Sequence, residues 1–323
     1  MPDVMFYEVF EEEGREIKRI LPKDIQAGFT SKTIQGEGAL LLPAPLISVR
    51  TQSRIPLDWS QGLKGILTRS QGYYHVVAFH RESKTDIDCG FLGDYCSRAV
   101  AEQAALMMMF LLRKLKKQEN NFISFSRDGL TGLECKGRKA LVVGVGNIGK
   151  EIVDIARGLR MAVKGVDIVE TLQGLDYVTL SEGMAWAEVV FCALSLTEKT
   201  DGMLNYRTFE KACQGVIFVN IARGEISPVE DLKKLLDEGK IAGIGLDVYP
   251  QECLLADSLR VQQPVESSQG KIVLALAKNE KVLFTPHNAF NTKEALGQKA
   301  SLTVAAVVSY LKKGRFPDSV PIL

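Results

Sequence analysis

The chain has 323 residues, roughly twice the usual length of one domain, so two domains are expected. Its 40 Lys and Arg residues nearly balance 39 Asp and Glu residues, for a net charge of +1. This balance provides no sequence-wide attraction to nucleic acid or to an anionic membrane. With 46% hydrophobic and 24% charged residues, the composition is typical of a globular protein and excludes a disordered or fibrous one.

Targeting and metal signals are missing from the sequence. The N-terminus is acidic and has no cationic start followed by an apolar core, and the longest apolar run, 104–112, is far shorter than the about 20 residues of a bilayer span. The six cysteines form no C-x-x-C pair, so we expect neither a metal site nor a disulfide framework. These features predict a cytoplasmic protein with reduced thiols.

The first 100 residues mix short apolar runs with turns. Strands are expected at 5–9, 39–42 and 65–67. Residues 99–117 are good helix formers, apolar on most faces, with a cationic end that suits the negative pole of a helix. We interpret this stretch as one buried helix that joins two domains.

The following section alternates apolar runs with helical segments. Residues 147–159 and 227–239 have amphipathic helical spacing, and Ser227 with Glu230 forms a capping-box pattern at the start of the second. Alternating strands and helices predict a doubly wound parallel sheet. A second long helix is expected at 292–313. The strands are expected at 140–145, 163–167, 189–194, 216–221, 241–248 and 282–285.

A glycine-rich turn lies between the first of these strands and its helix. Gly144, Gly146 and Gly149 form the pattern G-x-G-x-x-G. The first allows a tight turn, the second lets the backbone approach a pyrophosphate, and the third allows close helix–strand packing. The N–H groups of the next helix, which starts at Asn147 and Ile148, would face the phosphates. This is the fingerprint of a dinucleotide-binding domain.

Asp167 closes the next strand, about 20 residues after the glycines. A carboxylate there accepts hydrogen bonds from a ribose 2′-hydroxyl and repels a 2′-phosphate. Ile168 and Val169 follow it, and no arginine is present to receive such a phosphate. We therefore predict NAD rather than NADP as the cofactor.

Three further segments stand at strand ends, where ligands bind in open α/β sheets. They read NIARGEI (220–226), GLDVYPQE (245–252) and TPHNAFNT (285–292). Together with the glycine fingerprint, and in this order, they resemble the motifs of the D-isomer-specific 2-hydroxyacid dehydrogenases. The family patterns are N-x-[AS]-R-G, D-V-[FY]-x-x-E-P and T-P-H-x-A; in this chain Cys253 replaces the final proline of the second.

The resemblance assigns roles to three residues. Arg223 is the substrate-orienting arginine, Glu252 the acid partner and His287 the acid–base residue. The chemistry suits these side chains, because imidazole exchanges a proton near neutral pH and a nearby carboxylate favours its protonated form. A guanidinium group can hold a carboxylate and polarise a 2-oxo oxygen. Each residue alone is also consistent with an ordinary salt bridge or surface turn.

The same resemblance places Thr197, Ala222 and Asp247 around the cofactor. On the substrate side, the backbone N–H groups near Gln71 and Gly72 would bind the substrate carboxylate. Arg50 and Tyr95 would line the same pocket, although ordinary surface turns explain those two residues equally well.

The family implies an α/β fold of two Rossmann-like domains with a cleft between them. Residues 1–102 and 288–323 would form a discontinuous, flavodoxin-like substrate domain, and residues 103–287 the NAD-binding domain. We expect a homodimer acting on a small 2-hydroxy or 2-oxo acid, without nucleic acid or membrane. The alternatives are a formate or phosphite dehydrogenase of the same family, and an NAD-sensing module that recruits partner proteins.

Overall fold

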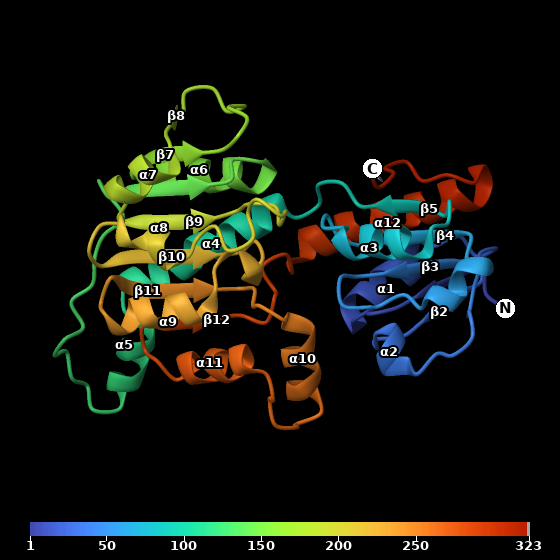
Figure 1. The fold of residues 1–323 in the computed structure, drawn as a ribbon, viewed down its shortest axis with the longest axis horizontal. Helices are drawn as coiled ribbons and strands as arrows, with labels where there is room; N and C mark the ends of the chain where they lie inside the picture. The colour runs from blue at the N-terminus through green and yellow to red at the C-terminus, as the bar shows by residue number, and fades with distance from the viewer. Residues whose placement is uncertain (322–323) are drawn as a thin grey trace. The chain divides into compact units, whose positions relative to one another are not determined.

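A computed structural model describes residues 1–321. The chain divides into two compact units, Met1–Cys96 with Asn291–Leu323, and Ser97–Phe290 (Figure 1). The boundaries expected from the sequence, 102/103 and 287/288, lie a few residues from these. Each unit is built on one all-parallel sheet, which confirms the predicted α/β class with two doubly wound sheets.

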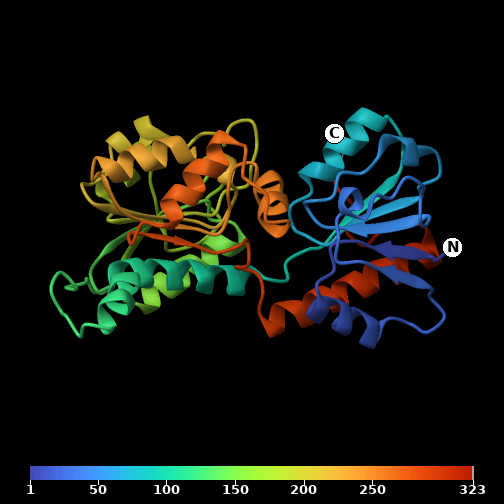
Figure 2. The ribbon, with the colours of Figure 1, turned by 90° about the horizontal axis from the view of Figure 1, so that it is seen from below.

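The first unit has the strand order β2-β1-β3-β4-β5, the flavodoxin-like arrangement. Helices α1 and α12 cover one face of the sheet and α3 covers the other (Figure 2). Its strands are β1 (Val4–Phe6), β2 (Ala27–Phe29), β3 (Leu46–Val49), β4 (Gly65–Thr68) and β5 (Asp88–Phe91). Its helices are α1 (Glu11–Ile20), α2 (Ile34–Glu37), α3 (Tyr74–Ser83) and α12 (Lys293–Lys313), with a 3-10 turn η1 (Leu57–Gln61).

The prediction of a strand at 39–42 is wrong. Leu40 and Leu41 are 91% and 84% exposed in a loop, and the strand lies after Pro45 as β3, whose four residues are all buried. Both runs are apolar, and only burial between the helix layers distinguishes them. The strand β5 was not expected because its sequence, DCGF, includes Asp and Gly, which are uncommon in strands.

The second unit has the strand order β12-β11-β10-β9-β6-β7-β8, which contains the Rossmann order of a dinucleotide-binding sheet. Its strands are β6 (Lys139–Val143), β7 (Ala162–Val166), β8 (Asp176–Tyr177), β9 (Val189–Cys192), β10 (Val216–Asn220), β11 (Ile241–Leu246) and β12 (Val282–Phe284). The six predicted strands of this region are confirmed, and β8 is additional. Their near-continuous apolar sequences reflect burial on both faces.

The helices of this unit pack on both sides of the sheet (Figure 2). They are α4 (Ser97–Leu112), α5 (Leu115–Phe122), α6 (Asn147–Gly158), α7 (Leu180–Trp186), α8 (Tyr206–Glu210), α9 (Val229–Asp237), α10 (Glu252–Arg260) and α11 (Ser268–Ala277), with a 3-10 turn η2 (Gly224–Ile226). No helix within residues 1–321 is both long and apolar enough to cross a membrane.

Two local predictions about helices are wrong. The helix expected at 99–117 breaks at Lys114, whose left-handed φ of 53° separates α4 from α5. The hydroxyl of Ser227 does not cap α9, because it accepts a hydrogen bond from the side chain of Asn220 at 2.9 Å and the helix begins after Pro228.

Candidate active site

An imidazole–carboxylate pair stands at the carboxyl ends of β11 and β12. Gln251 has a left-handed φ of 53°, and α10 begins directly after it with Glu252. His287 follows β12, and its Nδ1 lies 2.7 Å from Oε1 of Glu252. The two side chains are 28% and 20% exposed, so the pair is partly shielded and still reachable from solvent.

The loop that carries His287 is held by Asp247. The buried carboxylate of Asp247 accepts hydrogen bonds from the hydroxyl of Thr285 at 2.5 Å and from the N–H groups of Asn288 and Ala289 at 2.9 and 3.0 Å. Burial raises the pKa of Asp247, while these hydrogen bonds and the nearby His287 act against that shift. The loop is therefore anchored on both sides of the imidazole.

Arg223 lies three residues after the end of β10 and directly before η2. The amide of Asn220 shapes this turn, since it donates to the carbonyl of Arg223 and accepts from the N–H of Ala222, both at 2.9 Å. The Arg223 guanidinium donates to the carbonyl of Ala222 at 2.6 Å. Gly224 is required next, because a Cβ there would lie 1.9 Å from the carbonyl carbon of Tyr249.

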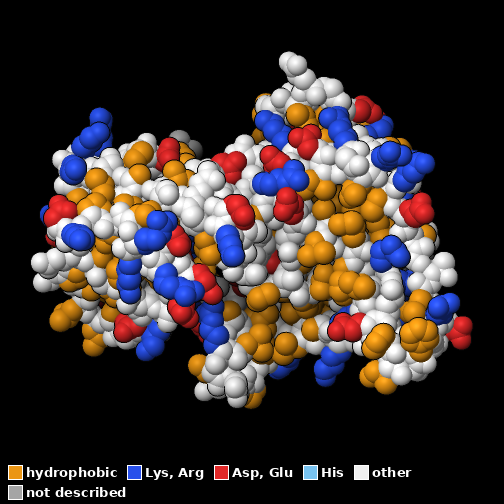
Figure 3. Space-filling model, turned by 180° about the vertical axis from the view of Figure 1, so that it is seen from behind, with side chains coloured by type: hydrophobic (Ala, Val, Ile, Leu, Met, Phe, Trp, Pro, Cys, Tyr) orange, Lys and Arg blue, Asp and Glu red, His pale blue; other side chains and the backbone are white. Residues whose placement is uncertain are grey.

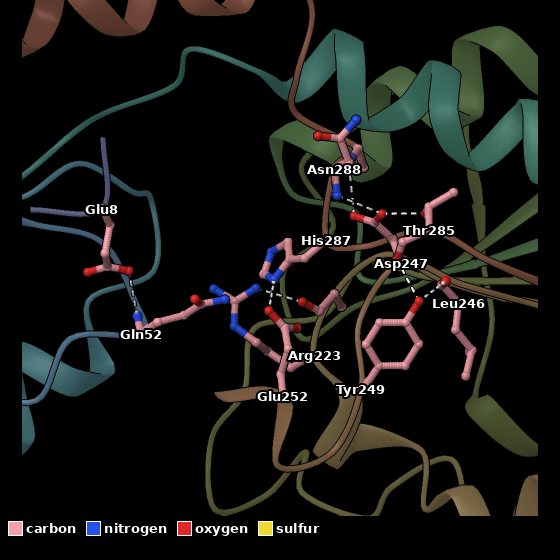
Figure 4. Close-up of polar contacts among 12 residues, drawn as sticks. Glu8, Gln52, Arg223, Leu246, Asp247, Tyr249, Glu252, Thr285, His287 and Asn288 are labelled. Atoms are coloured by element: carbon pink, nitrogen blue, oxygen red, sulfur yellow. Dashed lines mark hydrogen bonds and ion pairs between the residues drawn. The ribbon is translucent and has the colours of Figure 1, made fainter. Parts of the chain in front are cut away.

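The structure brings these three predicted residues together. Figure 4 shows the guanidinium of Arg223 on the same side as the paired side chains of Glu252 and His287. They come from three segments separated in sequence and joined only by the parallel sheet. A cation, an acid–base group and its carboxylate partner at one sheet edge are suited to binding an anionic substrate and moving a proton.

The glycine motif has the geometry that a dinucleotide needs. Gly144 has a φ of 93°, and a Cβ there would meet the backbone of Ala193 at 2.7 Å. A Cβ on Gly149 would lie 2.0 Å from the carbonyl oxygen of Gly144, so only glycine allows this helix–strand contact. A Cβ on Gly146, by contrast, would have no such neighbour within 4 Å in the part of the chain that the structure describes, and α6 starts there with Asn147 and Ile148. This open space at a helix N-terminus fits a pyrophosphate.

Asp167 follows β7 and supports the glycine turn. One of its carboxylate oxygens accepts from the N–H of Val145 at 2.6 Å, and the other from Ile168 and Val169 at 2.7 and 3.2 Å. Farther along the same sheet edge, Thr197 starts an exposed turn through hydrogen bonds with Thr200.

Besides Arg223, the predicted substrate residues lie in the first unit, close to strand ends. Arg50 directly follows β3, Gln71 and Gly72 lie between β4 and α3, and Tyr95 follows β5. The carboxylate of Glu8 shapes the loop after β3, because it accepts hydrogen bonds from the backbone N–H groups of residues 50, 52 and 53; the bond to Gln52 is drawn in Figure 4. The amide of Gln71 donates to Asp94 at 3.1 Å.

A buried ionic cluster in the first unit was not predicted. Glu13 of α1 lies 2.7 Å from Nζ of Lys299 on α12 and 3.1 Å from Nε of Arg69, and all three side chains are fully buried. Arg69 also donates to the carbonyl of Tyr7. The Nζ of Lys299 lies 5.8 Å from the ring centre of Tyr95, next to the predicted substrate residues. The three residues are far apart in sequence, so no local pattern indicates them.

The chain matches known proteins over most of its length. Residues 105–289 match the family model of the NAD-binding domain of the D-isomer specific 2-hydroxyacid dehydrogenases. A 2-hydroxyacid dehydrogenase homolog of Haemophilus influenzae is 32% identical over 266 residues, which cover 80% of this chain and 78% of that protein. A D-lactate dehydrogenase of Escherichia coli is 33% identical over 68% of each chain.

Solved structures have the same fold. A D-lactate dehydrogenase of Aquifex aeolicus, determined with NAD and lactic acid, superposes with a TM-score of 0.84 at 25% identity, covering 97% of this chain and 98% of that one. Together with the glycine motif and the Arg223, Glu252 and His287 arrangement, these matches show that the chain belongs to the D-isomer specific 2-hydroxyacid dehydrogenase family and is an NAD-dependent oxidoreductase that acts on a CH–OH group.

Proposed function

We propose that this enzyme interconverts a small 2-oxo acid and the corresponding D-2-hydroxy acid, with His287 as the acid–base residue. The observation that carries this proposal is the 2.7 Å contact between the His287 imidazole and the Glu252 carboxylate, beside Arg223. When bound, NAD would accept the hydride during oxidation, and NADH would donate it during reduction. Gly146, the start of α6 and Asp167 are the groups that would hold it.

In this proposal Glu252, His287 and Arg223 each have a separate role. Glu252 engages Nδ1 of His287, which leaves Nε2 as the ring atom that exchanges a proton with the substrate oxygen. During reduction the imidazolium donates that proton, and during oxidation the neutral ring accepts it. Arg223 binds the substrate carboxylate and polarises the 2-oxo group.

The substrate side of the proposal rests on the first unit. The backbone around Gln71 and Gly72 would bind the substrate carboxylate, while Arg50 and Tyr95 would limit the size of the side chain. Relatives are named D-lactate dehydrogenase and, in Clostridium sporogenes, aromatic 2-oxoacid reductase. Because Tyr95 is a large, buried residue, we propose pyruvate and other short-chain 2-oxo acids as the preferred substrates.

A substrate screen tests the proposed function. NADH oxidation is followed with pyruvate, glyoxylate, hydroxypyruvate, 2-oxobutyrate and phenylpyruvate, and NAD reduction with formate and phosphite. We expect turnover of short 2-oxo acids, and a kcat lower by about 10²–10⁴ in His287→Gln with NADH binding retained. Full activity of that variant contradicts the role of His287. Turnover of formate or phosphite alone, or NADH-dependent assembly without turnover, contradicts the proposed reaction.

We also propose that the enzyme is a homodimer. An apolar face is exposed on α4 and α5, with Leu106 at 52%, Leu115 at 45% and Phe122 at 73% exposure. Figure 3 shows hydrophobic side chains gathered over this side of the second unit. Exposed apolar patches of this kind commonly mark protein–protein contacts. A second copy of the chain, related by twofold symmetry, would cover this patch with its own α4 and α5.

A further inference from the structure

Tyr249 occupies a junction in the second unit that the acid–base chemistry does not itself use. It follows β11 by three residues and is 8% exposed. Its hydroxyl donates to the carbonyl oxygen of Thr285 at 2.5 Å and lies 3.3 Å from that of Leu246. Its ring packs edge-on against Phe284, with the ring centres 5.3 Å apart. The side chain is therefore fixed at both its apolar and its polar end.

The carbonyl of Thr285 that receives this hydroxyl also shapes the backbone of His287. It accepts the N–H of His287 at 2.9 Å, which closes a tight turn over Pro286. His287 leaves this turn with a left-handed φ of 50°, a strained conformation that persists only where the surroundings impose it. The Tyr249 hydroxyl donates a hydrogen bond to the same carbonyl oxygen that closes this turn (Figure 4).

Tyr249 also contacts the other two parts of the site through its backbone. Its carbonyl carbon is the atom nearest to the position of a Cβ on Gly224, so the Arg223–Gly224 turn lies directly against it. Three residues later, after the left-handed Gln251, the chain presents Glu252. One residue thus touches the turn after Arg223, leads to Glu252 and anchors the turn before His287.

We propose that Tyr249 is a positioning residue, whose hydroxyl holds the 285–287 turn so that the His287 imidazole stays against Glu252. This inference rests on the proposed function of His287. Burial, Asp247 and Glu252 all raise the pKa of Tyr249, so the phenol stays a neutral hydrogen-bond donor at working pH. It makes no proton transfer of its own.

The test is Tyr249→Phe, which removes one oxygen and keeps the ring against Phe284. We expect kcat to fall about 10-fold, because small displacements of a catalytic group are costly, while KM for the 2-oxo acid and the Kd of NADH change by less than about twofold. The primary isotope effect with NADH deuterated at the transferred position should rise. Tyr206→Phe is the matched control, because it removes an exposed hydrogen bond to Glu238 in the same unit and should change none of these values.

A readout without turnover separates positioning from general stability. The chain has three histidines, so ring signals in nitrogen-15 NMR spectra can be assigned by removing each in turn. In Tyr249→Phe the His287 signals should broaden or shift, and those of His75 and His80 should stay in place. The melting temperature should fall by no more than about 2–4 °C, the effect of one lost hydrogen bond.

Two results would overturn the positioning role. One is an unchanged kcat and isotope effect in Tyr249→Phe; the other is a loss of kcat that merely follows a loss of NADH affinity and folded protein. The proposed function fails separately, when the wild-type enzyme does not turn over 2-oxo acids or when His287→Gln keeps full activity.

Discussion

One carboxylate oxygen of Asp167 accepts from the N–H of Val145 in the glycine turn, and the other accepts from the N–H groups of Ile168 and Val169, which follow it. The carboxylate is thereby fixed at the end of β7, where a ribose 2′-hydroxyl would bind and a 2′-phosphate would be repelled. Asp167→Ala should lower the ratio of kcat/KM for NADH to that for NADPH by about 10-fold or more, the effect of one strong charge contact. Steady-state kinetics with both cofactors measure this ratio.

Glu170→Ala is the control, because this exposed carboxylate lies in the same loop. It should leave the cofactor preference as it is. A preference that Asp167→Ala does not change would show that the carboxylate supports the turn without selecting the cofactor.

Lys299 should make the stability of the first unit depend on pH at neutral and alkaline values. Burial, together with the charges of Arg50 and Arg69, lowers its pKa to about 7. Burial alone would raise the pKa of Glu13, but the cations around that carboxylate outweigh it and lower the pKa to about 2. Since Lys299 loses its proton more readily when folded than when unfolded, the unfolded chain binds more protons between pH 7 and the ordinary lysine value. The free energy of unfolding should therefore rise with pH across this range, by on the order of 2 kcal/mol between pH 7 and 9.

Urea unfolding of Lys299→Met tests this dependence. The variant keeps the Glu13–Arg69 pair and should lose most of the rise between pH 7 and 9, because its side chain does not titrate. Lys293→Met, an exposed position on the same helix, should behave like the wild type. An equal rise in all three proteins would assign the pH dependence to other groups.

At the scale of elements, α4 presents two large apolar side chains to solvent. Leu106 and Met109 of α4 are 52% and 36% exposed, although the neighbouring positions of this helix are buried. Leu106→Asp should convert the proposed dimer into a monomer at micromolar concentration, because a carboxylate would be buried at the contact. Light scattering after gel filtration measures the molar mass.

Leu254→Asp is a matched control for this experiment, since Leu254 on α10 is 50% exposed outside this face. It should leave the mass unchanged. A wild-type enzyme that is monomeric in the same measurement would contradict the dimer directly.

Secondary structure could be predicted well where burial covers both faces of an element. The strands of the second unit are continuous apolar runs, and the glycine turn has positions where only glycine fits. Prediction failed where a residue's role depends on a partner outside its own element. The hydroxyl of Ser227 accepts a hydrogen bond from Asn220 of β10, and the apolar run at Leu40 lies exposed in a loop.

The residues of the candidate site could likewise be predicted only in part. Arg223, Glu252 and His287 could be named from motifs at strand ends, because parallel strands bring their carboxyl ends to one edge. The anchoring of the His287 turn by Tyr249, and the Glu13–Arg69–Lys299 cluster, could not be named. Both depend on contacts between segments that are far apart in the sequence, and no regular residue spacing predicts such contacts.

At the scale of the whole molecule, all residues proposed to bind NAD lie in the unit Ser97–Phe290. A ligand that binds only the folded state stabilises it by about 2.7 kcal/mol at a concentration of 100 times its Kd. NADH should therefore raise the melting temperature in differential scanning fluorimetry, and NADPH at the same concentration should raise it much less. Equal shifts with the two cofactors would contradict the NAD preference at the level of binding.

The chain order also has a consequence for biosynthesis. The sheet of the first unit is translated before the second unit, whereas α12, which carries Lys299 against Glu13, is translated after it. The intervening unit is continuous and can finish folding on the ribosome while the earlier strands still lack a covering layer. A ribosome-bound chain that has exposed residues up to about 290, but not yet α12, should therefore protect residues 97–290 from protease and leave the first strands open to cleavage.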